Sequence, residues 1–337
     1  MVWERRWNPL QEDWVTITGH RNSRPWSLPQ KRILRPSQDY DPSCALCPGN
    51  QRISGKRNPD YQSIFIFDND HPAFALPAPS NKEIKNSPFV SAPAGGLCRV
   101  VCYSPAHNKT LADLSIDETK RLIDAWAAQT SELMSLEKIE QVLIFENSGE
   151  LVGVSNAHPH GQIYATEFVM ETLKKEARAF ENSSPPLMEN LLKAEIADGS
   201  RMLYEGADVL AFVPYFAKFP YEVFIVPRNQ HQFLSGLSAA ERQDLAAALN
   251  EILRRYAAMW NCPFPYMMLV HQSPCDISYP SFHTHIQIHP ILRGPNLPKY
   301  LASVETGANH FLNDGSPEEK AAELRKVDIV STGQKTC

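Results

Sequence analysis

Two histidines spaced two residues apart, in a segment that also carries a carboxamide, are the clearest chemical feature of the sequence. The segment reads Asn156-Ala157-His158-Pro159-His160-Gly161-Gln162. In an extended segment alternate side chains share a face, so we expect His158, His160 and Gln162 to point the same way. A neutral imidazole there can attack a phosphorus atom, while the neighbouring amide donates to a phosphoryl oxygen. The alternative is a pair of chance surface histidines.

A Cys-x-x-Cys pair supplies a second candidate site. Cys44 and Cys47 directly precede Pro48-Gly49, in sequence typical of turns. Redox chemistry is one interpretation and a turn pair without a metal is another, but the histidines elsewhere favour a metal site. The chain has seven cysteines, an odd and scattered number that argues against a disulfide framework. Cys98 and Cys102 stand in apolar, strand-like sequence and are predicted to be buried thiols.

Length and composition bound the class of protein. At 337 residues and 43% hydrophobic content, the chain is long enough for two domains or one duplicated unit. Its 33 basic and 38 acidic residues give no basic footprint for a nucleic-acid backbone. The first residues lack the apolar stretch of a secretory signal, and no run approaches the roughly 18 apolar residues of a membrane span. We therefore expect a cytoplasmic protein with no nucleic-acid or membrane partner.

Two long helices with the same start signal must help to position these residues. Ser115 and Glu118 form a capping box that predicts a helix over about 115–136. Ser238 and Glu241 form the same box at the start of a second helix, which is predicted over about 238–259. The shared signal is the first indication that the chain repeats itself.

Strands and histidines follow these helices in the same order in both halves. The two helix starts are 123 residues apart, and His160 and His285 are 125 residues apart. A near-constant offset over such a distance indicates internal duplication. The predicted strands lie at 99–103 and 141–145 in the first half and at 222–226 and 266–270 in the second.

This order predicts an α+β fold of two tandem units, each with an antiparallel sheet and a packed helix. The first unit covers residues 1–185 and carries His160, and the second covers 186–337. Residues 1–60 are rich in Pro, Arg and Asn, and we expect little regular structure there.

The ordered motifs resemble the galactose-1-phosphate uridylyltransferase family of the histidine-triad superfamily. The resemblance covers about residues 3–328 and is most specific in the segment from Ser155 to Gln162. It implies a histidine-triad-like fold, nucleotidyl transfer, and a homodimer whose sites draw residues from both subunits. The other matching segments are His20 to Trp26, Cys44 to Cys47, Phe67 to Asp70, Cys98 to Val100, Ser104 to His107 and Phe145 to Asn147.

The resemblance implies that His160 is a nucleophile. An attacking imidazole splits a transfer between two phosphates into two displacements through a covalent phosphoramidate. The acceptor is an ionised phosphate and needs no general base, so catalysis rests on positioning and charge stabilisation. Gln162 and Ser155 are then donors to the phosphoryl oxygens, although Ser155 by its spacing alone fits an ordinary turn hydroxyl equally well.

Two metal sites are also implied. Two thiolates and two imidazoles form a common closed, structural zinc site, and the family places Cys44, Cys47, His107 and His158 there. The second set is Glu176, His271, His283 and His285, which suits iron or zinc equally. Sequence alone favours a solvated carboxylate for Glu176, since it stands in a charged helical stretch.

Nucleotide and sugar contacts follow from the same resemblance. Arg21 and Arg24 match arginines near the phosphates, although a surface arm with solvated charges is the alternative. Lys299 to Glu305, including Tyr300, matches the sugar segment, but Val304 replaces a tyrosine and Phe311 stands where a glutamine is common. Positions matching the uridine pocket are Phe67, Asn69, Asp70, Val100, Asn147 and Gly153.

The expected reaction is therefore UMP exchange between UDP-glucose and galactose 1-phosphate. A related nucleotidyltransferase or phosphorylase is an alternative, with another sugar phosphate, phosphate or sulfate as acceptor, or with ADP-glucose as donor. A non-catalytic nucleotide-binding protein is a third reading, and the intact His158-Pro159-His160-Gly161-Gln162 speaks against it. Loss of the tyrosine and glutamine would make the sugar pocket more apolar, and an apolar pocket discriminates less well between sugar hydroxyl groups.

Overall fold

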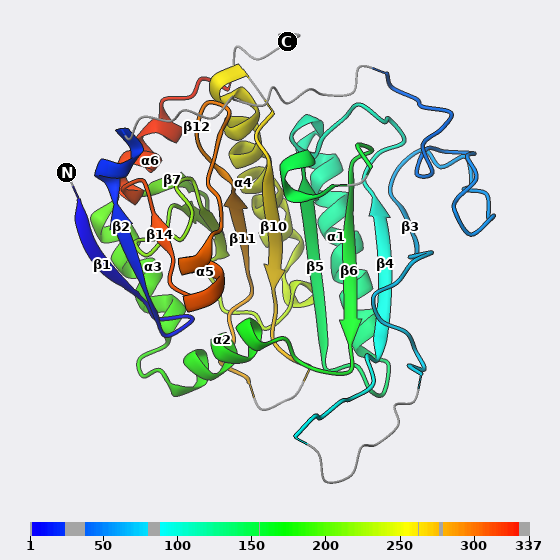
Figure 1. Cartoon of the computed structure of the whole chain (residues 1–337), viewed down its shortest axis with the longest axis horizontal. Helices are drawn as coiled ribbons and strands as arrows, with labels where there is room; N and C mark the ends of the chain where they lie inside the picture. Colours follow the sequence, from blue (N-terminus) through cyan, green and yellow to red (C-terminus); the bar gives the residue numbers. More distant parts are fainter. Residues whose placement is uncertain are drawn as a thin grey trace.

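A single antiparallel sheet of nine strands forms the centre of the molecule (Figure 1). The computed structural model describes residues 2–23, 38–79, 88–154, 156–261, 263–275 and 279–329. The strand order across the sheet is β3-β4-β6-β5-β10-β11-β9-β8-β7. The strands are β3 (Phe65–Asp68), β4 (Gly96–Cys102), β5 (Gln141–Ser148), β6 (His160–Thr166), β7 (Met202–Glu205), β8 (Val209–Phe212), β9 (Val223–Pro227), β10 (Tyr266–His271) and β11 (His285–Pro290).

The sheet confirms the duplication predicted from the sequence. From one edge the order is β3-β4-β6-β5, and from the other side it is β8-β9-β11-β10, ending at the same junction. There β5 and β10 pair directly, with Phe145 opposite Leu269. The two predicted antiparallel sheets are therefore halves of one sheet, and the two His-x-His segments lead into the equivalent strands β6 and β11.

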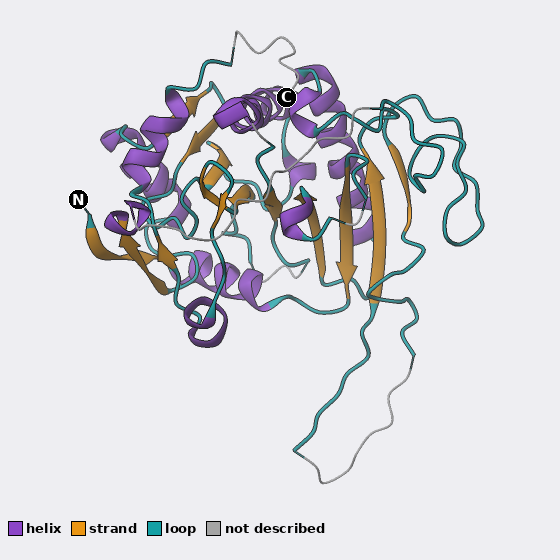
Figure 2. Ribbon diagram, turned by 45° about the horizontal axis from the view of Figure 1, so that its top comes forward, coloured by secondary structure: helices purple, strands orange, loops and turns teal. Residues whose placement is uncertain are grey.

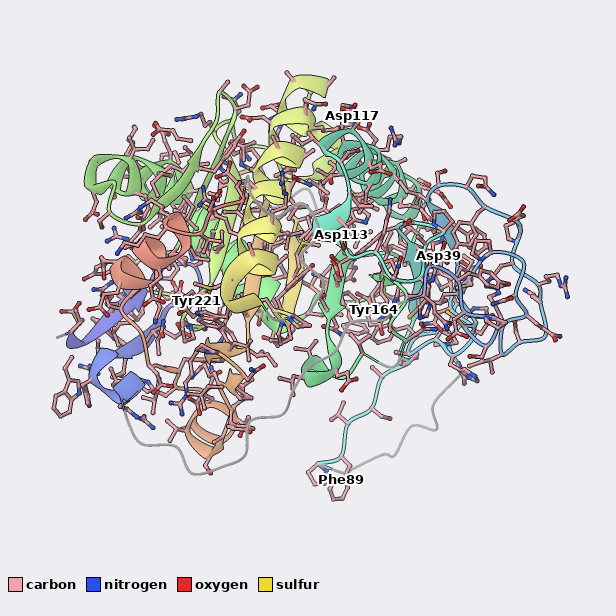
Figure 3. All side chains as sticks on the ribbon, turned by 90° about the horizontal axis from the view of Figure 1, so that it is seen from above. Asp39, Phe89, Asp113, Asp117, Tyr164 and Tyr221 are labelled. Atoms are coloured by element: carbon pink, nitrogen blue, oxygen red, sulfur yellow. The ribbon has the colours of Figure 1, made fainter. Side chains whose placement is uncertain are left out.

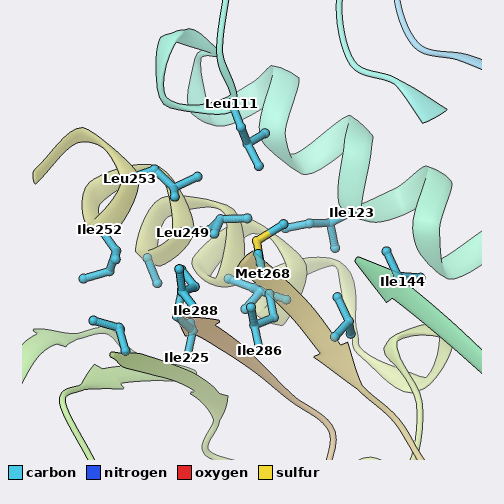
Figure 4. Packing of buried hydrophobic residues seen from close by; sticks show 14 of the residues in the cluster. Leu111, Ile123, Ile144, Ile225, Leu249, Ile252, Leu253, Met268, Ile286 and Ile288 are labelled. Atoms are coloured by element: carbon cyan, nitrogen blue, oxygen red, sulfur yellow. The ribbon is translucent and has the colours of Figure 1, made fainter. Parts of the chain in front are cut away.

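Two long helices pack side by side on one face of this sheet. They are α1 (Ile116–Met134) and α4 (Ala239–Ala258), and Ser115 and Ser238 cap them with the predicted capping boxes. Each helix is shorter by two or fewer residues at either end than the sequence predicts. Figure 4 shows Ile123 of α1 and Leu249 of α4 facing Met268 of the sheet. This large apolar core holds the strands of both halves in fixed register.

The opposite face is covered only in part. The helices α2 (Glu171–Asn182) and α3 (Leu187–Asp198) pack there against the strands of the second half. Phe180 of α2 and Phe224 of β9 belong to this second core. In the first half, side chains of β3 and β6 on this face stay half-buried, among them that of His160.

The expectation of little regular structure in residues 1–60 is wrong for the first part of that stretch. The strands β1 (Trp3–Asn8) and β2 (Asp13–Thr18) form a hairpin, and β14 (Leu312–Asn313) adds to it. Arg6 fixes the hairpin by an ion pair with Glu318, at 2.8 Å. The remaining elements are β12 (Leu292–Gly294), β13 (Leu297–Pro298), α5 (Ser303–Ala308) and α6 (Pro317–Arg325).

The described residues just before β4 project away from the sheet as an arm (Figure 2). Phe89 lies at its far end with 76% of its surface exposed (Figure 3). Of the helices that the structure describes, none is long and apolar enough to cross a membrane.

Candidate active site and metal clusters

Strand register brings the predicted pocket residues into one row. Phe67 of β3 pairs with Val100 of β4, Val100 with Gln162 of β6, and Gln162 with Phe145 of β5. Neighbouring strands lie about 4.8 Å apart, so this row forms a continuous floor of three apolar side chains and one amide. His160 starts β6, two residues before Gln162, and therefore stands on the same face of the sheet.

The His160 ring is held in one orientation by a hydrogen bond to the backbone. Its Nδ1 lies 2.8 Å from the carbonyl oxygen of His158, so Nδ1 carries the hydrogen and donates it. Nε2 is then unprotonated and keeps its lone pair. Burial lowers the pKa of His160, although the hydrogen bond to His158 opposes this, and the ring stays neutral near pH 7.

Gly161 lets β6 lie close to its neighbours. A Cβ at this position would overlap the Tyr103 hydroxyl and would approach the Phe145 carbonyl oxygen to 3.0 Å. The hydroxyls of Tyr103 and Tyr266 donate to the buried carboxyl of Glu146 behind the strand. Burial raises the pKa of Glu146 to about 8, despite the two hydrogen bonds. A neutral carboxyl group thus lies below the strand that presents His160.

The other predicted nucleotide residues flank this floor. Asn69 and Asp70 follow β3 directly, and the Asn69 side chain accepts a hydrogen bond from the His71 amide at 2.9 Å. Asn147 lies near the end of β5, two residues beyond Phe145. Gly153 ends a short 3-10 helix (Glu150–Val152) with φ of 81°, a left-handed conformation that favours glycine. Arg24 and Ser155 lie outside the described residues.

The first metal cluster forms as predicted. The ligand atoms of Cys44, Cys47, His107 and His158 all lie within 4.8 Å of one another, and all four residues are buried. Cys47 Sγ lies 3.5 Å from His158 Nδ1 and 3.7 Å from His107 Nδ1, close to the edges of a tetrahedral zinc site. Burial raises the pKa of Cys47 to about 11, so a bound metal ion must displace a proton from this thiol.

His158 has a different place from the one expected. It precedes β6 rather than lying on it, because the ladder starts at His160, and its ring turns into the metal cluster. Its Nε2 lies 2.9 Å from the Ser104 carbonyl oxygen and 3.0 Å from the Tyr61 hydroxyl. With Nε2 carrying the hydrogen, Nδ1 is free to bind a metal ion. His158 therefore joins the cluster through its ring and orients His160 through its carbonyl group.

The second cluster brings together three of its four predicted members. Glu176, His271 and His285 are buried, with His271 Nδ1 2.6 Å from Glu176 Oε2. The solvated position that sequence alone favours for Glu176 is thus wrong, because its side chain is fully buried. His283 is not in this cluster. Its Nε2 lies 2.8 Å from the Pro227 carbonyl oxygen, the same arrangement that His158 has with Ser104.

The predicted sugar segment lines a separate cavity of about 270 Å³. Lys299 lies 3.4 Å from Glu305, whose other carboxyl oxygen caps the start of α5. Tyr300 and Val304 line the cavity and are more than 40% exposed. Phe311 is not among its lining residues, because its ring lies against Phe219 at 5.9 Å. Only one of the two departures from the family pattern therefore affects the cavity.

Arg21 and an ion-pair network complete this cavity. Arg21 Nε lies 3.5 Å from Asp314, which also lies 3.4 Å from Arg293. No described residue that lines the cavity belongs to β3, β4, β5 or β6. In Figure 1, α5 lies in front of the second half of the sheet, away from β6. The sugar cavity and His160 of one chain thus belong to different regions.

Sequence reasoning missed several residues that contact the clusters. Gln287 Nε2 lies 2.9 Å from His285 Nε2 and 3.3 Å from Glu176 Oε1. Its duplication counterpart is Gln162, so the repeat could have identified it. Tyr61 contacts His158 of the first cluster, and Arg52 contacts Phe67 of the pocket floor. No spacing signal in the sequence marks either residue.

Comparisons with known proteins agree with this geometry. The family model described as galactose-1-phosphate uridyl transferase, N-terminal domain, matches residues 1–170, and the C-terminal domain model matches 171–335. Galactose-1-phosphate uridylyltransferase of Haemophilus influenzae is 34% identical over 98% of this chain and 96% of its own length. The Thermotoga maritima protein of the same name is 32% identical over 97% and 99%.

Solved structures extend the comparison to the fold. A uridylyltransferase structure covers 96% of this chain and 98% of its own, with 26% identity and a TM-score of 0.77. An ADP-glucose phosphorylase from Arabidopsis thaliana has the same TM-score and 22% identity over 97% of this chain and 99% of its own, which shows the fold alone. With both family models matched along nearly its whole length, the chain belongs to the galactose-1-phosphate uridylyltransferase family of enzymes.

Proposed function

We propose that this enzyme exchanges UMP between UDP-glucose and galactose 1-phosphate in galactose metabolism, through a nucleotide bound to His160. The observation that carries the proposal is the hydrogen bond from His160 Nδ1 to the His158 carbonyl group. It leaves Nε2 unprotonated, on the face of the sheet that carries the row formed by Phe67, Val100 and Gln162.

The reaction consists of two displacements at phosphorus. His160 Nε2 attacks the α-phosphorus of UDP-glucose, a P–N bond forms, and the P–O bond to glucose 1-phosphate breaks with its electron pair on the leaving oxygen. The phosphate of galactose 1-phosphate then attacks the same phosphorus and displaces the imidazole. Gln162 donates to the phosphoryl oxygens, and we assign the same role to Ser155, with Arg21 and Arg24 balancing the phosphate charge.

We assign one metal ion to each of the two clusters. Cys44, Cys47, His107 and His158 suit zinc, which would be structural because four protein ligands leave no open position. Glu176, His271 and His285 suit iron or zinc, and we propose that His283 joins them as the fourth ligand by a turn of its ring away from Pro227. The free described thiols support a reducing compartment, and we place the protein in the cytoplasm.

Labelled donors test the nucleotide and the acceptor. We expect UDP-glucose labelled at the α-phosphate to leave an alkali-stable label on the protein, and ADP-glucose to leave none. Galactose 1-phosphate should release that label, while inorganic phosphate or sulfate should not. A label from ADP-glucose, released by phosphate, would contradict the proposal and assign the phosphorylase reaction instead. No label from either donor, in folded protein, would exclude the covalent mechanism.

A second copy of the chain completes the site in our proposal. The cavity with Arg21, Lys299 and Glu305 holds none of the described residues around His160, so a dimer would place one copy's cavity against the other's nucleophile. This arrangement agrees with an isologous dimer, in which each partner supplies the same surface to the other.

Subunit complementation tests this arrangement. His160→Ala and Glu305→Ala homodimers should each be nearly inactive. After mixing with exchange of subunits, random assortment should restore about a quarter of the wild-type activity, because half the dimers hold one intact composite site. Mixtures of His160→Ala with Lys299→Ala should recover the same fraction of activity. Mixtures of Lys299→Ala with Glu305→Ala should stay inactive, because both chains then carry a defective cavity. A mixture of the first pair without recovery would show that each site is formed by one chain.

A further inference from the structure

Tyr61 connects the first metal cluster to β3, the strand that supplies Phe67 to the pocket floor. Its hydroxyl donates to the Leu46 carbonyl oxygen at 2.6 Å, between Cys44 and Cys47 in the chain. The Tyr61 hydroxyl oxygen in turn accepts from His158 Nε2 at 3.0 Å. One buried phenol thus holds both the cysteine loop and a metal-ligating histidine, in the manner of the outer hydrogen bonds that orient metal ligands.

The Tyr61 ring begins a stack that ends in the nucleotide pocket. Its centroid lies 5.0 Å from that of Phe65, with 21° between the planes, and Phe65 lies 5.2 Å from Phe67 at 27°. The guanidinium carbon of Arg52 lies 4.1 Å from the Phe67 centroid. These contacts bury Tyr61 in the same small apolar cluster as Cys44 and Val100. The cysteine loop and the pocket floor therefore share one core.

Arg52 extends these contacts to Asp70, which matches a uridine-pocket position of the family. Its Nη1 lies 3.7 Å from Asp70 Oδ1, and its side chain is only 10% exposed. Its Nε and Nη1 have no hydrogen-bond partner among the described residues, so the Phe67 face and the Asp70 charge determine where the guanidinium lies. A cation on an aromatic face is a favourable arrangement in a partly desolvated site.

We propose that Tyr61 is a positioning residue that couples the first metal cluster to the nucleotide pocket, so that metal retention and nucleotide binding strengthen each other. The proposal rests on the metal and nucleotide assignments made above. Without the hydroxyl, Leu46 loses a buried partner and His158 keeps Ser104 alone, so the cysteine loop and Phe65 are free to shift together. Coupling of this kind is reciprocal, because both ligands favour the same arrangement of the stack.

Metal release measures the coupling without using turnover. The metal-loaded enzyme is challenged with an excess of chelator, and free metal is followed by a colorimetric indicator with and without saturating UMP. In the wild type we expect UMP to slow release by about fivefold or more. In Tyr61→Phe, release should be about tenfold faster and the UMP effect should disappear. In Arg52→Met, release without UMP should stay near the wild-type rate while the UMP effect is lost.

Tyr256→Phe is the matched control. Tyr256 is also buried and also donates to a carbonyl group, that of Tyr221 at 2.6 Å, but it lies in the main core behind the second half of the sheet. Its loss should lower the unfolding temperature as Tyr61→Phe does, without changing metal release. Equal rates of metal release in Tyr61→Phe and Tyr256→Phe would overturn the coupling. So would a Tyr61→Phe enzyme in which UMP slows metal release as much as in the wild type. Both results stand apart from the proposed function, because the His160 adduct can form in either case. Wild-type enzyme without bound metal would overturn both the coupling and the metal assignment.

Discussion

His160→Ala will abolish the covalent nucleotide adduct and lower the rate of transfer by on the order of 10⁴-fold to 10⁶-fold. The imidazole is the group that bonds to phosphorus. Alanine has no nucleophilic atom at that position, so the covalent intermediate that divides the transfer into two steps does not form. The fold should be unaffected, because His160 is half-buried and its ring makes one hydrogen bond, to the His158 carbonyl group. Loss of label from UDP-glucose, measured beside the circular dichroism spectrum, checks both expectations.

Two further variants give this prediction its controls. Gln162→Ala removes a donor to the phosphoryl group but leaves the nucleophile, so it should slow adduct formation by about 10²-fold to 10³-fold without preventing it. His231→Ala removes an imidazole that pairs with Glu241 outside both clusters, at 2.8 Å, and should keep full labelling. An adduct that persists in His160→Ala would move the nucleophile elsewhere and would remove the main support for the proposed mechanism.

Local sequence signals predict the helices and the symmetry of the fold. The capping boxes at Ser115 and Ser238 are short-range features, and both helices begin where those boxes place them. The hairpin at Trp3–Thr18 was missed because its strand pattern is unusual. In β1 the inward positions hold Arg6 and Asn8, whereas Trp7 on the outward side is exposed, so the polarity of the alternation is reversed. Glu318 and the Tyr215 carbonyl group, both far along the chain, hold the buried arginine together with Glu4.

The site shows a similar division between local pattern and tertiary arrangement. The family resemblance names the four residues that lie together in the first cluster. Spacing mispredicts the direction of His158, since Pro159 cannot donate to a ladder and the strand starts one residue later. Spacing also predicts that His283 and His285 belong to the same metal site. Among the described residues, however, His283 has no counterpart of the Cys44–Cys47 loop that His158 faces. Burial of Glu176 follows from packing of α2 on the sheet, which charge pattern in one helix does not reveal.

Cys47→Ser will remove the metal from the first cluster and lower the free energy of unfolding by several kcal/mol. Cys47 is fully buried and lies within 3.7 Å of both histidine ligands, so serine there replaces a soft thiolate by a weak oxygen donor in an apolar site. Structural zinc contributes on the order of 10 kcal/mol in small zinc domains, because the bound state exists only when folded. Metal content by mass spectrometry and denaturant unfolding, each on the purified variant, measure the two effects.

The same change should reach the nucleophile, because His158 is both a cluster ligand and the acceptor of the His160 hydrogen bond. Without the metal ion the His158 backbone loses its anchor, and the adduct with UDP-glucose should form more slowly even below the unfolding temperature. Cys98→Ser is the matched control, since Cys98 is a buried free thiol on β4 that belongs to neither cluster. It should retain the metal and label normally. A Cys47→Ser enzyme with full metal content and normal labelling would show that the cluster does not orient His160.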